Sequence, residues 1–596
     1  MSTSGKWLKS GEAVLTKYQP LTSPDDAKSD VEFEGHEAET SYHDSQPTRS
    51  QRNEPNDQLD VYTVEEAVDK MGFGVFQILL CLFAGSIWVV EAFEVMILAI
   101  LSVAVKCEWN LSYAEEATIS TVVFFGFLVG SPLWGVIADK YGRKTALFMV
   151  EVVGFVFGVV SAFSPDYYTL LLFRGLVGFG LGGGFLGPAY CVEFLPARSR
   201  AVVICLIQVA WAVGSVMEAL LALVVMTSID HEPWRWLLGL SAIPLLLVIL
   251  VFPLVPESPR YLIYCGKEEK AKKVLASIAK INCKQLPEGR LVTAEEKERM
   301  AKEYSPPLDD VMESVMLSTG GKNDVGFGTL PSMEVSQKSD LSMIASCHES
   351  ERELLLGERT HRRGLSCSCI KDTINDKIVG YYHWTLILFK NGWWKTTLLL
   401  WYLWFAANLV YYGGALLTTA LFQHDSHCGL KENDTDDEGC KELTKSDYIH
   451  LVWTTGAEFP GTLWIIVLLL LIGRKKSMAI TTLAAAACYG LLFICLNKTV
   501  LTVFLFGVRG FATGFFQAIY LYTPEVYPTA VRAFGMSLCS SVSRVGAMIA
   551  PYIAQTLLAY NFSITISLFI GFSVLSSLTS LLLPIETRGR AMKDTG

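Results

Sequence analysis

The sequence lacks the short motifs that mark common hydrolytic enzymes and ATP-driven pumps. None of H-E-x-x-H, G-x-S-x-G or a Walker loop occurs in its 596 residues, so we expect neither hydrolytic chemistry nor direct pumping by ATP. The 14 cysteines show no paired C-x-x-C spacing and no dense disulfide framework, which predicts no metal site and no cofactor. An enzyme is therefore the least favoured class of protein.

Charge is also scarce in this chain. Charged residues make up 18% of it, the net charge is −10, and the basic residues occur in short clusters such as 142–144. A nucleic-acid partner needs a continuous basic face, so this distribution argues against one. The first residues, MSTSGKWLKSGEAV, lack the apolar core of a signal peptide, and we expect the first apolar span to target the membrane.

What the chain has in abundance is apolar sequence. Hydrophobic residues make up 51% and the mean hydropathy is +0.36, which indicates a membrane protein with several spans. Apolar runs of roughly 20 residues are long enough to cross a bilayer as helices. The first six predicted spans are 76–101, 117–137, 146–163, 170–190, 202–226 and 236–254. The second six are 396–422, 449–471, 479–496, 501–522, 536–559 and 564–583. The sequence therefore predicts an all-α membrane protein with about twelve transmembrane helices.

Polar segments divide these spans into regions. Residues 1–69 are acidic and poor in aromatics, which predicts a disordered N-terminal tail. The two sets of spans predict six-helix bundles over 70–256 and 394–586, followed by a short tail at 587–596. The region between the bundles, 257–393, contains the amphipathic stretch KEEKAKKVLASIAKI and then low-complexity sequence. We predict a linker with one docked helix and a disordered insertion.

Basic residues in the short loops predict the orientation. They gather in DKYGRK, ARSR, GRKK and TRGR, whereas the loops on the other side, such as CEWNLSYAEE and SIDHE, are neutral or acidic. The positive-inside rule then places both termini and the linker in the cytoplasm. We expect an integral multi-pass protein of an intracellular vesicle membrane or the plasma membrane that functions as a monomer.

The two sets of spans repeat the same charged motifs in the same order. EFLPARSR at 193–200 and EVYPTAVR at 525–532 share the pattern E-x-x-P-x-x-x-R. GVIADKYGRK, RGLVG and PESPR in the first half correspond to LIGRKK, an Arg-Gly pair and PIETRGR in the second. Two homologous six-helix units explain this repeat.

On these motifs the chain resembles the major facilitator superfamily, in the branch of sugar porters and organic ion transporters. The resemblance to this branch also rests on the stretches VEEAVDKMGFGVFQ, CEWNL, RGLVGFGLGG, AEFPG, TPEVYP and LPIETRGR. It covers roughly 64–590 apart from the middle of the linker. The resemblance implies the major facilitator fold, with two pseudo-symmetric six-helix halves, and transport of a small solute by alternating access.

The repeated octets place opposite charges at cytoplasmic helix ends, where such pairs can form a latch. Each octet glutamate has two candidate partners, the arginine that closes its own octet and the arginine of the preceding G-R-K motif. The resemblance to sugar porters implies that breaking these pairs is part of opening inward; a permanent loop anchor is the alternative. Leu470 stands where the family pattern has an aspartate, so the second latch is expected to be weaker or differently wired. The predicted gating residues are Asp139, Arg143, Arg174, Glu193, Arg200, Glu257, Arg474, Arg509, Glu525, Arg532 and Glu586.

Ionisable residues inside apolar spans are costly and usually functional. Glu91 and Glu94 are about one helical turn apart in the first span, and Arg544 lies in the eleventh. In the family that the chain resembles, these two spans line the central cavity. Arg544 either binds an anionic solute or neutralises one glutamate, leaving the other for a cation or proton. A structural ion pair without a ligand is a third interpretation.

Aromatic and hydrogen-bonding side chains accompany these charges, a mixture typical of pockets for small organic molecules. The predicted solute-binding residues are Trp88, Glu91, Glu94, Gln208, Trp211, Asn408, Tyr411, Tyr412, Gln517 and Arg544. The glycines of GFGLGGG match G-x-G-x-x-G, but they lie within an apolar span and do not follow a strand. Close helix packing explains them better than nucleotide binding.

The loop after the seventh predicted span carries features of an oxidising compartment. Cys428 and Cys440 flank a glycosylation sequon at Asn433 and are candidates for a disulfide, with Cys107 as a third candidate partner. The pairing among the three cysteines stays open.

Two cytoplasmic patterns resemble sorting signals. One is the tyrosine-based Y-Q-P-L from Tyr18 to Leu21, and the other is the dileucine pair of Leu355 and Leu356. Binding of sorting adaptors is the functional interpretation, and a chance match in polar sequence is the alternative.

Together these patterns favour transmembrane transport of a small organic solute. An organic ion is preferred because charged residues dominate the candidate pocket. A sugar-like porter and a non-transporting vesicle-membrane receptor or scaffold are the alternatives. The expected partners are the small-molecule solute, the lipid bilayer and sorting adaptors.

Overall fold

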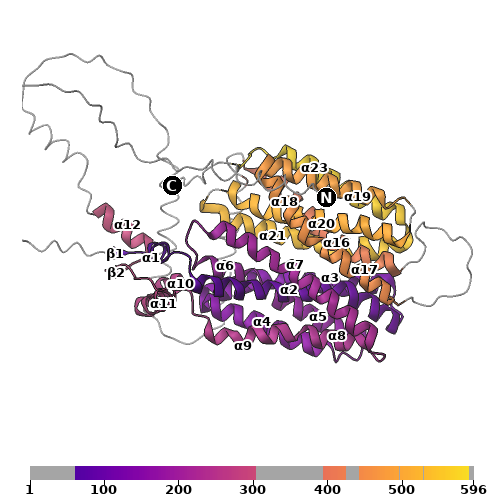
Figure 1. Ribbon diagram of the computed structural model, residues 1–596, viewed down its shortest axis with the longest axis horizontal. Coiled ribbons are helices and arrows are strands. Elements are labelled where there is room, and N and C mark those ends of the chain that lie inside the picture. Colours follow the sequence, from indigo (N-terminus) through magenta and orange to yellow (C-terminus); the bar gives the residue numbers. More distant parts are fainter. Residues whose placement is uncertain are drawn as a thin grey trace, which may run out of the picture. The chain divides into compact units, whose positions relative to one another are not determined.

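The described part of the chain is almost entirely helical (Figure 1). The computed structural model describes residues 61–303, 389, 393–423, 442–494, 497–527 and 529–588. The side chain of Arg532 lies outside this description, as do the low-complexity part of the linker, both sorting motifs, Asn433, Cys428 and Cys440. The predictions on these residues stay predictions.

The N-terminal half contains helical segments over each of its six predicted spans. They are α2 (Val75–Trp109), α3 (Tyr113–Tyr141), α4 (Arg143–Ser161), α5 with α6 (Tyr167–Leu181, Leu186–Val192), α7 (Arg200–Ser228), and α8, α9 and η1 (Pro233–Ser241, Ile243–Val251, Phe252–Leu254).

The C-terminal half repeats this arrangement. Its segments are α16 (Trp394–Gln423), α17 with α18 (Lys445–Gly456, Glu458–Ile472), α19 (Arg474–Leu491), α20 (Lys498–Val526), α21 with η3 and α22 (Thr529–Pro551, Tyr552–Leu557, Leu558–Tyr560), and α23 (Phe562–Leu582). Within the described ranges, ten segments are suited to crossing a membrane by length and composition. The other two predicted spans, 479–496 and 536–559, fall on α19 and on α21 to α22.

Local sequence signals set the helix ends. At the start of α3, Ser112 and Glu115 form a capping box in which each side chain accepts a hydrogen bond from the other's amide. The helix stops at Gly142, whose φ of +104° is a conformation that glycine tolerates best. Gly473, with φ of +87°, makes the corresponding turn between α18 and α19. The G-R-K repeat therefore encodes the same helix-to-helix turn in both halves.

The glycine-rich stretch of α5 allows close helix packing. A Cβ atom added to Gly178 would lie 2.1 Å from the carbonyl oxygen of Val123 on α3. Any larger residue would force the two helices apart. This contact supports the packing interpretation of the G-x-G-x-x-G match over nucleotide binding.

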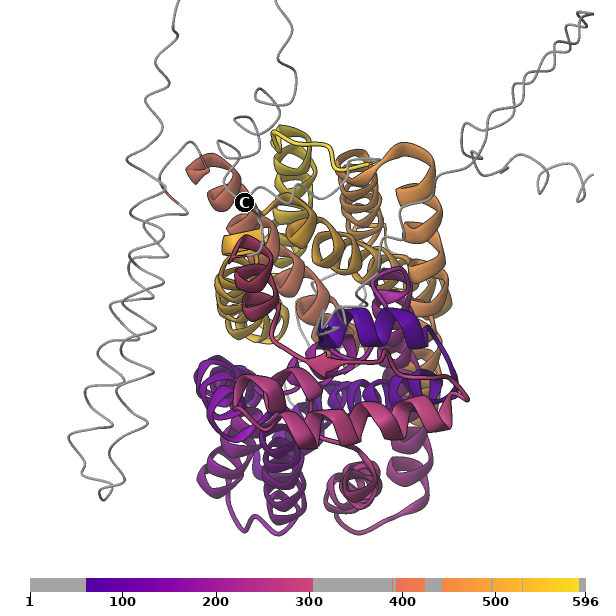
Figure 2. The ribbon, with the colours of Figure 1, turned by 90° about the vertical axis from the view of Figure 1, so that its left-hand side faces the viewer.

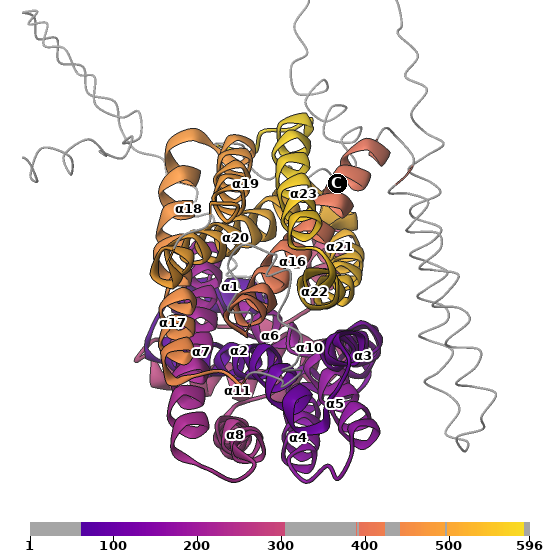
Figure 3. The same ribbon diagram turned by 90° about the vertical axis from the view of Figure 1, so that its right-hand side faces the viewer.

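The two halves pack side by side (Figure 3). The helix α21 packs on α3, and α17 packs on α7. One cluster of buried apolar residues joins α2 and α3 to α16 and α20, with Leu98 and Phe124 on one side and Leu409 and Val508 on the other. The interface between the halves is thus largely apolar, so the few polar side chains in it are candidates for a functional role.

A layer of short elements covers one end of the N-terminal half (Figure 2). The strand β1 (Val61–Tyr62) pairs in parallel with β2 (Arg290–Leu291). The helices of this layer are α1 (Val64–Met71), α10 (Pro259–Tyr264), α11 (Glu268–Ile281) and α12 (Ala294–Glu303). The helix α11 coincides with the predicted amphipathic stretch and buries Leu275 and Ile278. Asn282 then accepts a hydrogen bond from the Phe76 amide, which ties this helix to the start of α2.

The predicted disordered tail, 1–69, extends too far. Residues 61–69 form β1 and most of α1, which begins with a capping box between Thr63 and Glu66. The strand partner lies about 230 residues further along the chain, so the composition of the tail alone could not indicate this pairing.

Candidate functional site

A cavity lies between the two halves, and both halves line it. Its walls come from α2 and α7 on one side and from α16, α18, α20 and α21 on the other. The lining residues are Trp88, Glu91, Gln208, Trp211, Ala212, Tyr411, Tyr412, Glu458, Thr513, Phe516, Gln517, Tyr520 and Arg544. Eight of the ten predicted solute-binding residues are among them; the other two, Glu94 and Asn408, are not.

Sequence reasoning missed several lining residues for which a signal existed. Thr513, Phe516 and Tyr520 share a face of α20 with the predicted Gln517, because positions 513, 516, 517 and 520 follow the i, i+3, i+4, i+7 spacing of one helix face. Glu458 is an acid in an apolar span and is fully buried, a pattern that marks functional residues in membranes. Helical periodicity applied outward from Gln517 would have found the α20 residues.

Glu94 faces away from this cavity and binds Arg174. The guanidinium of Arg174 on α5 lies 3.0 Å from the Glu94 carboxylate on α2, and both side chains are at most 1% exposed. Arg174 therefore lies inside the N-terminal half and not with the latch residues among which it was predicted. Nearby, the Ser241 hydroxyl donates to the carboxylate of Glu218, another buried acid. A buried pair of this kind holds helices together only while both partners remain.

The C-terminal half contains a second buried ion pair, between Arg509 of α20 and Glu458 of α18. The guanidinium and carboxylate are 3.0 Å apart, and the Tyr411 hydroxyl donates to the same carboxylate at 2.9 Å. Trp211, from the N-terminal half, donates its indole N–H to Tyr411. Arg509 thus belongs to a polar chain between the halves and not to the latch with which it was predicted.

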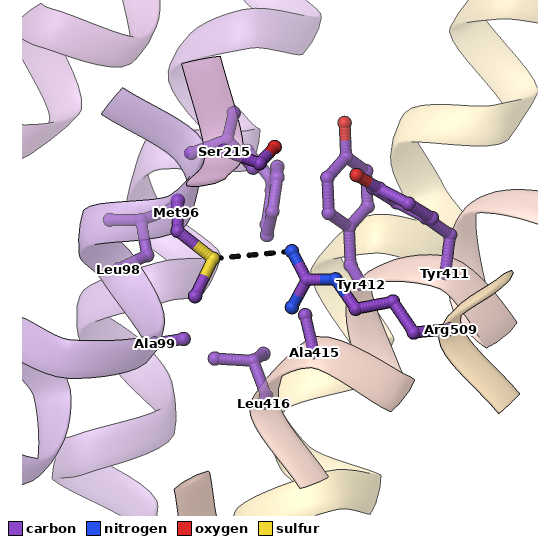
Figure 4. Close-up of a pocket in the computed structure, with 11 residues that line it drawn as sticks. Met96, Leu98, Ala99, Ser215, Tyr411, Tyr412, Ala415, Leu416 and Arg509 are labelled. Carbon is purple, nitrogen blue, oxygen red and sulfur yellow. Dashed lines mark hydrogen bonds between the residues drawn. The ribbon is translucent and has the colours of Figure 1, made fainter. Parts of the chain in front are cut away.

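Arg509 also points at the N-terminal half (Figure 4). Its Nη2 lies 3.2 Å from the sulfur of Met96 on α2, across a small second cavity lined by Ser215, Tyr411, Tyr412 and other residues of both halves. The ion pair of Arg509 and Glu458 therefore lies between two cavities at the interface of the halves.

Glu91 and Arg544 complete the charges of the main cavity. Glu91 is 7% exposed, and a Cβ atom on Gly184 would lie 2.5 Å from its carboxylate, so glycine makes room for this acid. Arg544, from α21, stacks its guanidinium on the Phe127 ring of α3, 4.6 Å from the ring centroid. Among the described residues, no ion pair joins Glu91 to Arg544. Of the two pairings predicted for Arg544 with a glutamate, neither forms in the described part of the chain.

The predicted latch of the N-terminal half forms between Arg143 and Glu193. Arg143 donates to the Glu193 carboxylate at 3.3 Å and to Asp139 at 2.8 Å. The hydroxyl of Ser258 donates to the same Glu193 carboxylate. Glu257 accepts the backbone amide of Lys144 at 3.0 Å, where a carboxylate complements the positive end of the α4 dipole.

Tyr261 contacts this network through its ring, whose centroid lies 6.0 Å from the Arg143 guanidinium, whereas Arg200 does not join it. Tyr261 donates its hydroxyl to the carbonyl of Lys140, and burial raises the pKa of Tyr261 to about 12, so the hydroxyl stays protonated. Arg200 donates to the carbonyl of Leu195 and approaches Glu65 at 3.9 Å. Of the two candidate partners of the first octet glutamate, the structure places the G-R-K arginine against it.

The C-terminal half repeats the latch with equivalent residues. Arg474 binds Glu525 through two hydrogen bonds, at 3.0 and 3.1 Å. Thr587 donates to Glu525 as Ser258 does to Glu193. The carboxylate of Glu586 accepts the amides of Arg474 and Lys475 at the start of α19, as Glu257 does at α4. Each latch connects helices of a single half.

A polar cluster joins the halves at the end of the bundle away from both latches, and sequence reasoning missed it. Gln555, in the π-helical segment η3, donates to Ser102 at 2.9 Å and to Glu116 at 3.0 Å. Glu116 also forms an ion pair with Lys106 at 2.8 Å. Nearby, the hydroxyls of Thr118 and Tyr552 lie 3.1 Å apart across the same interface. We call Ser102, Lys106, Glu116 and Gln555 the far-end cluster.

Cys107 is disulfide-bonded. Cys428 and Cys440, the other two candidates for a disulfide, lie outside the described residues. The third candidate of the sequence analysis therefore takes part in a disulfide.

A helical bundle of two repeated halves around a charged cavity is the architecture of a membrane transporter. The family description "Sugar (and other) transporter" matches residues 88–316 and 443–595. The chain is 38% identical over 544 residues to the synaptic vesicle 2-related protein of Pongo abelii, which covers 90% of this chain and 83% of that protein. It is 36% identical over 540 residues to organic cation/carnitine transporter 7 of Arabidopsis thaliana, covering 90% and 96% of the two chains.

A solved structure has the same fold. The partially occluded inward open conformation of the xylose transporter XylE from E. coli matches with a TM-score of 0.56 at 16% identity, over 87% of this chain and 99% of that one. This chain belongs to the sugar (and other) transporter family of the major facilitator superfamily. It is a multi-pass membrane transporter and not an enzyme, as the resemblance predicted.

Proposed function

We propose that this transporter carries a small organic ion by alternating access, with the solute bound in the cavity between its halves. The observation that carries the proposal is the lining of that cavity. It contains Glu91 and Arg544 beside the aromatic rings of Trp88 and Trp211. A buried acid and base without a shared ion pair are costly unless a ligand uses them. A relative named for organic cations and carnitine supports the same solute class.

Contacts between the halves support the alternating-access part. The far-end cluster joins η3 to α2 and α3, whereas each latch stays within one half. The halves can therefore separate at the latch end without breaking these latch pairs. We infer that the latches keep each six-helix bundle rigid while it rocks, and that the far-end cluster opens and closes.

Orientation and location follow from the loop charges and from the relatives. We infer that the latch end, which carries Arg143, Lys144, Arg474 and Lys475, faces the cytoplasm. The names of the synaptic vesicle 2-related proteins support a vesicle membrane. Adaptor binding at Leu21 and Leu356, a glycan at Asn433 and function as a monomer remain part of this proposal.

Uptake into proteoliposomes tests the function. The purified full-length protein is offered radiolabelled organic cations, organic anions, zwitterions and sugars, alongside protein-free vesicles. We expect saturable uptake of a charged class that falls at least ten-fold in Arg544→Gln or in Glu91→Gln. The exposed substitutions Lys280→Gln and Glu269→Gln change the same charges outside the cavity and serve as controls. Saturable uptake of sugars alone would favour the sugar-like porter, and no uptake of any class would favour a receptor or scaffold.

A further inference from the structure

The main cavity is lined by one acid and one base that come from opposite halves and have no ion-pair partner among the described residues. Glu91 lies on α2 of the N-terminal half, and Arg544 lies on α21 of the C-terminal half. Glu151 of α4 is buried within electrostatic reach of Glu91 and forms no ion pair among the described residues. Two other buried acids are paired, since Glu94 binds Arg174 and Glu458 binds Arg509. Among the described residues, Glu91 and Arg544 differ from these in having no ion-pair partner.

Each of the two groups has unused bonding capacity. Glu91 is only 7% exposed. In the described part of the chain, no hydrogen bond to its carboxylate is found. Arg544 has a buried Nε atom without a hydrogen-bond partner, and its guanidinium face is used by the Phe127 ring. A carboxylate and a guanidinium in an apolar span are stable only when something satisfies them.

The net charge of the ligand decides how both groups can be satisfied together. A simple cation would complement Glu91 but would bring a second positive charge into the cavity with Arg544. A simple anion would complement Arg544 but would face Glu91. A ligand with both charges complements both groups and adds no net charge to the apolar interior.

The aromatic rings indicate where the positive end lies. Trp88 and Glu91, one turn apart on α2, both line the cavity. The Trp88 ring meets the Trp211 ring edge to face, with centroids 5.5 Å apart. A quaternary or alkylated ammonium group gains from tryptophan faces beside a carboxylate. Arg544 presents a guanidinium that binds a carboxylate at the other end.

We propose that the solute is a zwitterion, with its ammonium group at Glu91, Trp88 and Trp211 and its anionic group at Arg544. The proposal rests on the proposed transport function and names its substrate class. Because the two charged contacts come from different halves, such a ligand also draws the halves together around itself, which a singly charged solute does not do.

Three probes of one shape test the proposal. They are 4-(trimethylammonio)butyrate, its methyl ester, which is only a cation, and 5,5-dimethylhexanoate, in which carbon replaces nitrogen and only the anion remains. Affinities are measured by calorimetry on the purified full-length protein, on Glu91→Gln and on Arg544→Gln. Size-exclusion profile and melting temperature without ligand report folding, and Glu91→Asp and Arg544→Lys replace any variant that does not fold.

We expect each variant to weaken binding of the zwitterion and of only one of the two singly charged probes. The wild type binds the zwitterion at least ten-fold more tightly than either singly charged probe. Glu91→Gln weakens the zwitterion and the ester about ten-fold or more and leaves the anion unchanged or tighter. Arg544→Gln weakens the zwitterion and the anion and leaves the ester unchanged or tighter. A control substitution outside the cavity, Lys280→Gln, changes none of the three.

Several results would overturn the proposal. If the anion binds as tightly as the zwitterion, or if Glu91→Gln leaves zwitterion binding intact, Glu91 does not hold a cationic group. If uptake of a singly charged solute still depends on Arg544, the proposed transport function stands and only the zwitterion proposal fails. If no probe binds and no solute of any class enters proteoliposomes, both proposals fail.

Discussion

Arg474 donates two hydrogen bonds to one carboxylate, that of Glu525, whereas its counterpart Arg143 divides its donors between Glu193 and Asp139. The difference follows from Leu470, which is 69% exposed where the first half has Asp139. Without a second acid in reach, the guanidinium turns both donors to the octet glutamate. The second latch is therefore differently wired, and its strength depends on a single carboxylate.

This wiring predicts unequal costs for removing the latch acids. Glu525→Gln should lower the free energy of unfolding by about 1–3 kcal/mol, because Glu525 is a half-buried acceptor for both Arg474 and Thr587. Asp139→Asn should cost about 0–1 kcal/mol, since Asp139 is mostly exposed and Arg143 keeps Glu193. Thermal unfolding of the purified variants in detergent measures both. Equal losses would contradict the wiring.

Introducing an aspartate at position 470, where the second half lacks one, also tests the wiring of the second latch. Leu470→Asp should allow Arg474 to divide its donors as Arg143 does. Glu525→Gln should then cost less in the Leu470→Asp background than in the wild type, because a second carboxylate remains. Leu471→Asp, one residue on and also exposed, is the matched control and should not lessen the cost.

The buried pair of Glu94 and Arg174 predicts strong coupling. Glu94→Gln or Arg174→Met alone leaves the other charge without its partner in the bundle, at a cost of about 3–5 kcal/mol in unfolding free energy. The double variant should lose much less than the two single losses added together. A double-mutant cycle by thermal or denaturant unfolding measures the coupling. Additive losses would mean that the 3.0 Å contact contributes nothing.

The far-end cluster predicts a shift between conformations. Gln555→Leu removes hydrogen bonds to Ser102 and Glu116 while keeping the size of the side chain, so closure at this end should weaken by about 1.5–3 kcal/mol. A reporter thiol from Ala415→Cys, which lines the second cavity, should react about ten-fold faster with an impermeant reagent added at that side. Thr227→Val, whose hydroxyl bonds only within its own helix turn, is the control. An unchanged reaction rate would mean that the far-end cluster does not control opening at this end of the protein.

The attachment of α12 predicts a pH dependence outside the membrane. The hydrogen bond from Lys297 at 2.6 Å lowers the pKa of Glu66. A lowered folded-state pKa contributes stability above the ordinary carboxyl value, and this stability is lost as the pH falls through the folded-state value. We expect amide exchange in α1 and α12 to speed up on acidification below about pH 4. Glu66→Gln should exchange faster at neutral pH and lose this acid dependence.

Much of the fold could be predicted because local sequence patterns determine where its helices begin and end. Apolar runs located the helices, and the repeated G-R-K, Arg-Gly and octet motifs indicated two equivalent halves. The latch pair of Arg143 and Glu193 was one of two alternatives, because charge order along the chain restricts partners without selecting one. Only three-dimensional packing distinguishes Arg143 from Arg200.

The site was predictable where one residue type is unusual in its surroundings. Glu91 and Arg544 stand out in apolar spans, and both line the cavity. Glu94 stands out equally but faces Arg174, because a step of three residues on a helix turns a side chain by about 60° from its neighbour. Gln555 gave no signal at all, since an amide near a helix end is common and its partners lie about 440 residues earlier.

The central claim is that a cavity between the halves opens alternately to the two sides, and a reversible lock at the far end tests it most directly. Thr118→Cys and Tyr552→Cys stand on opposite halves, and the native hydroxyls are 3.1 Å apart. A reducible bifunctional thiol reagent joins them, and each single variant treated alike is the control. We predict that the linked protein still gains thermal stability from the solute it carries but loses uptake into proteoliposomes, and that reduction restores uptake. Undiminished uptake by the fully linked protein would contradict alternating access between these halves.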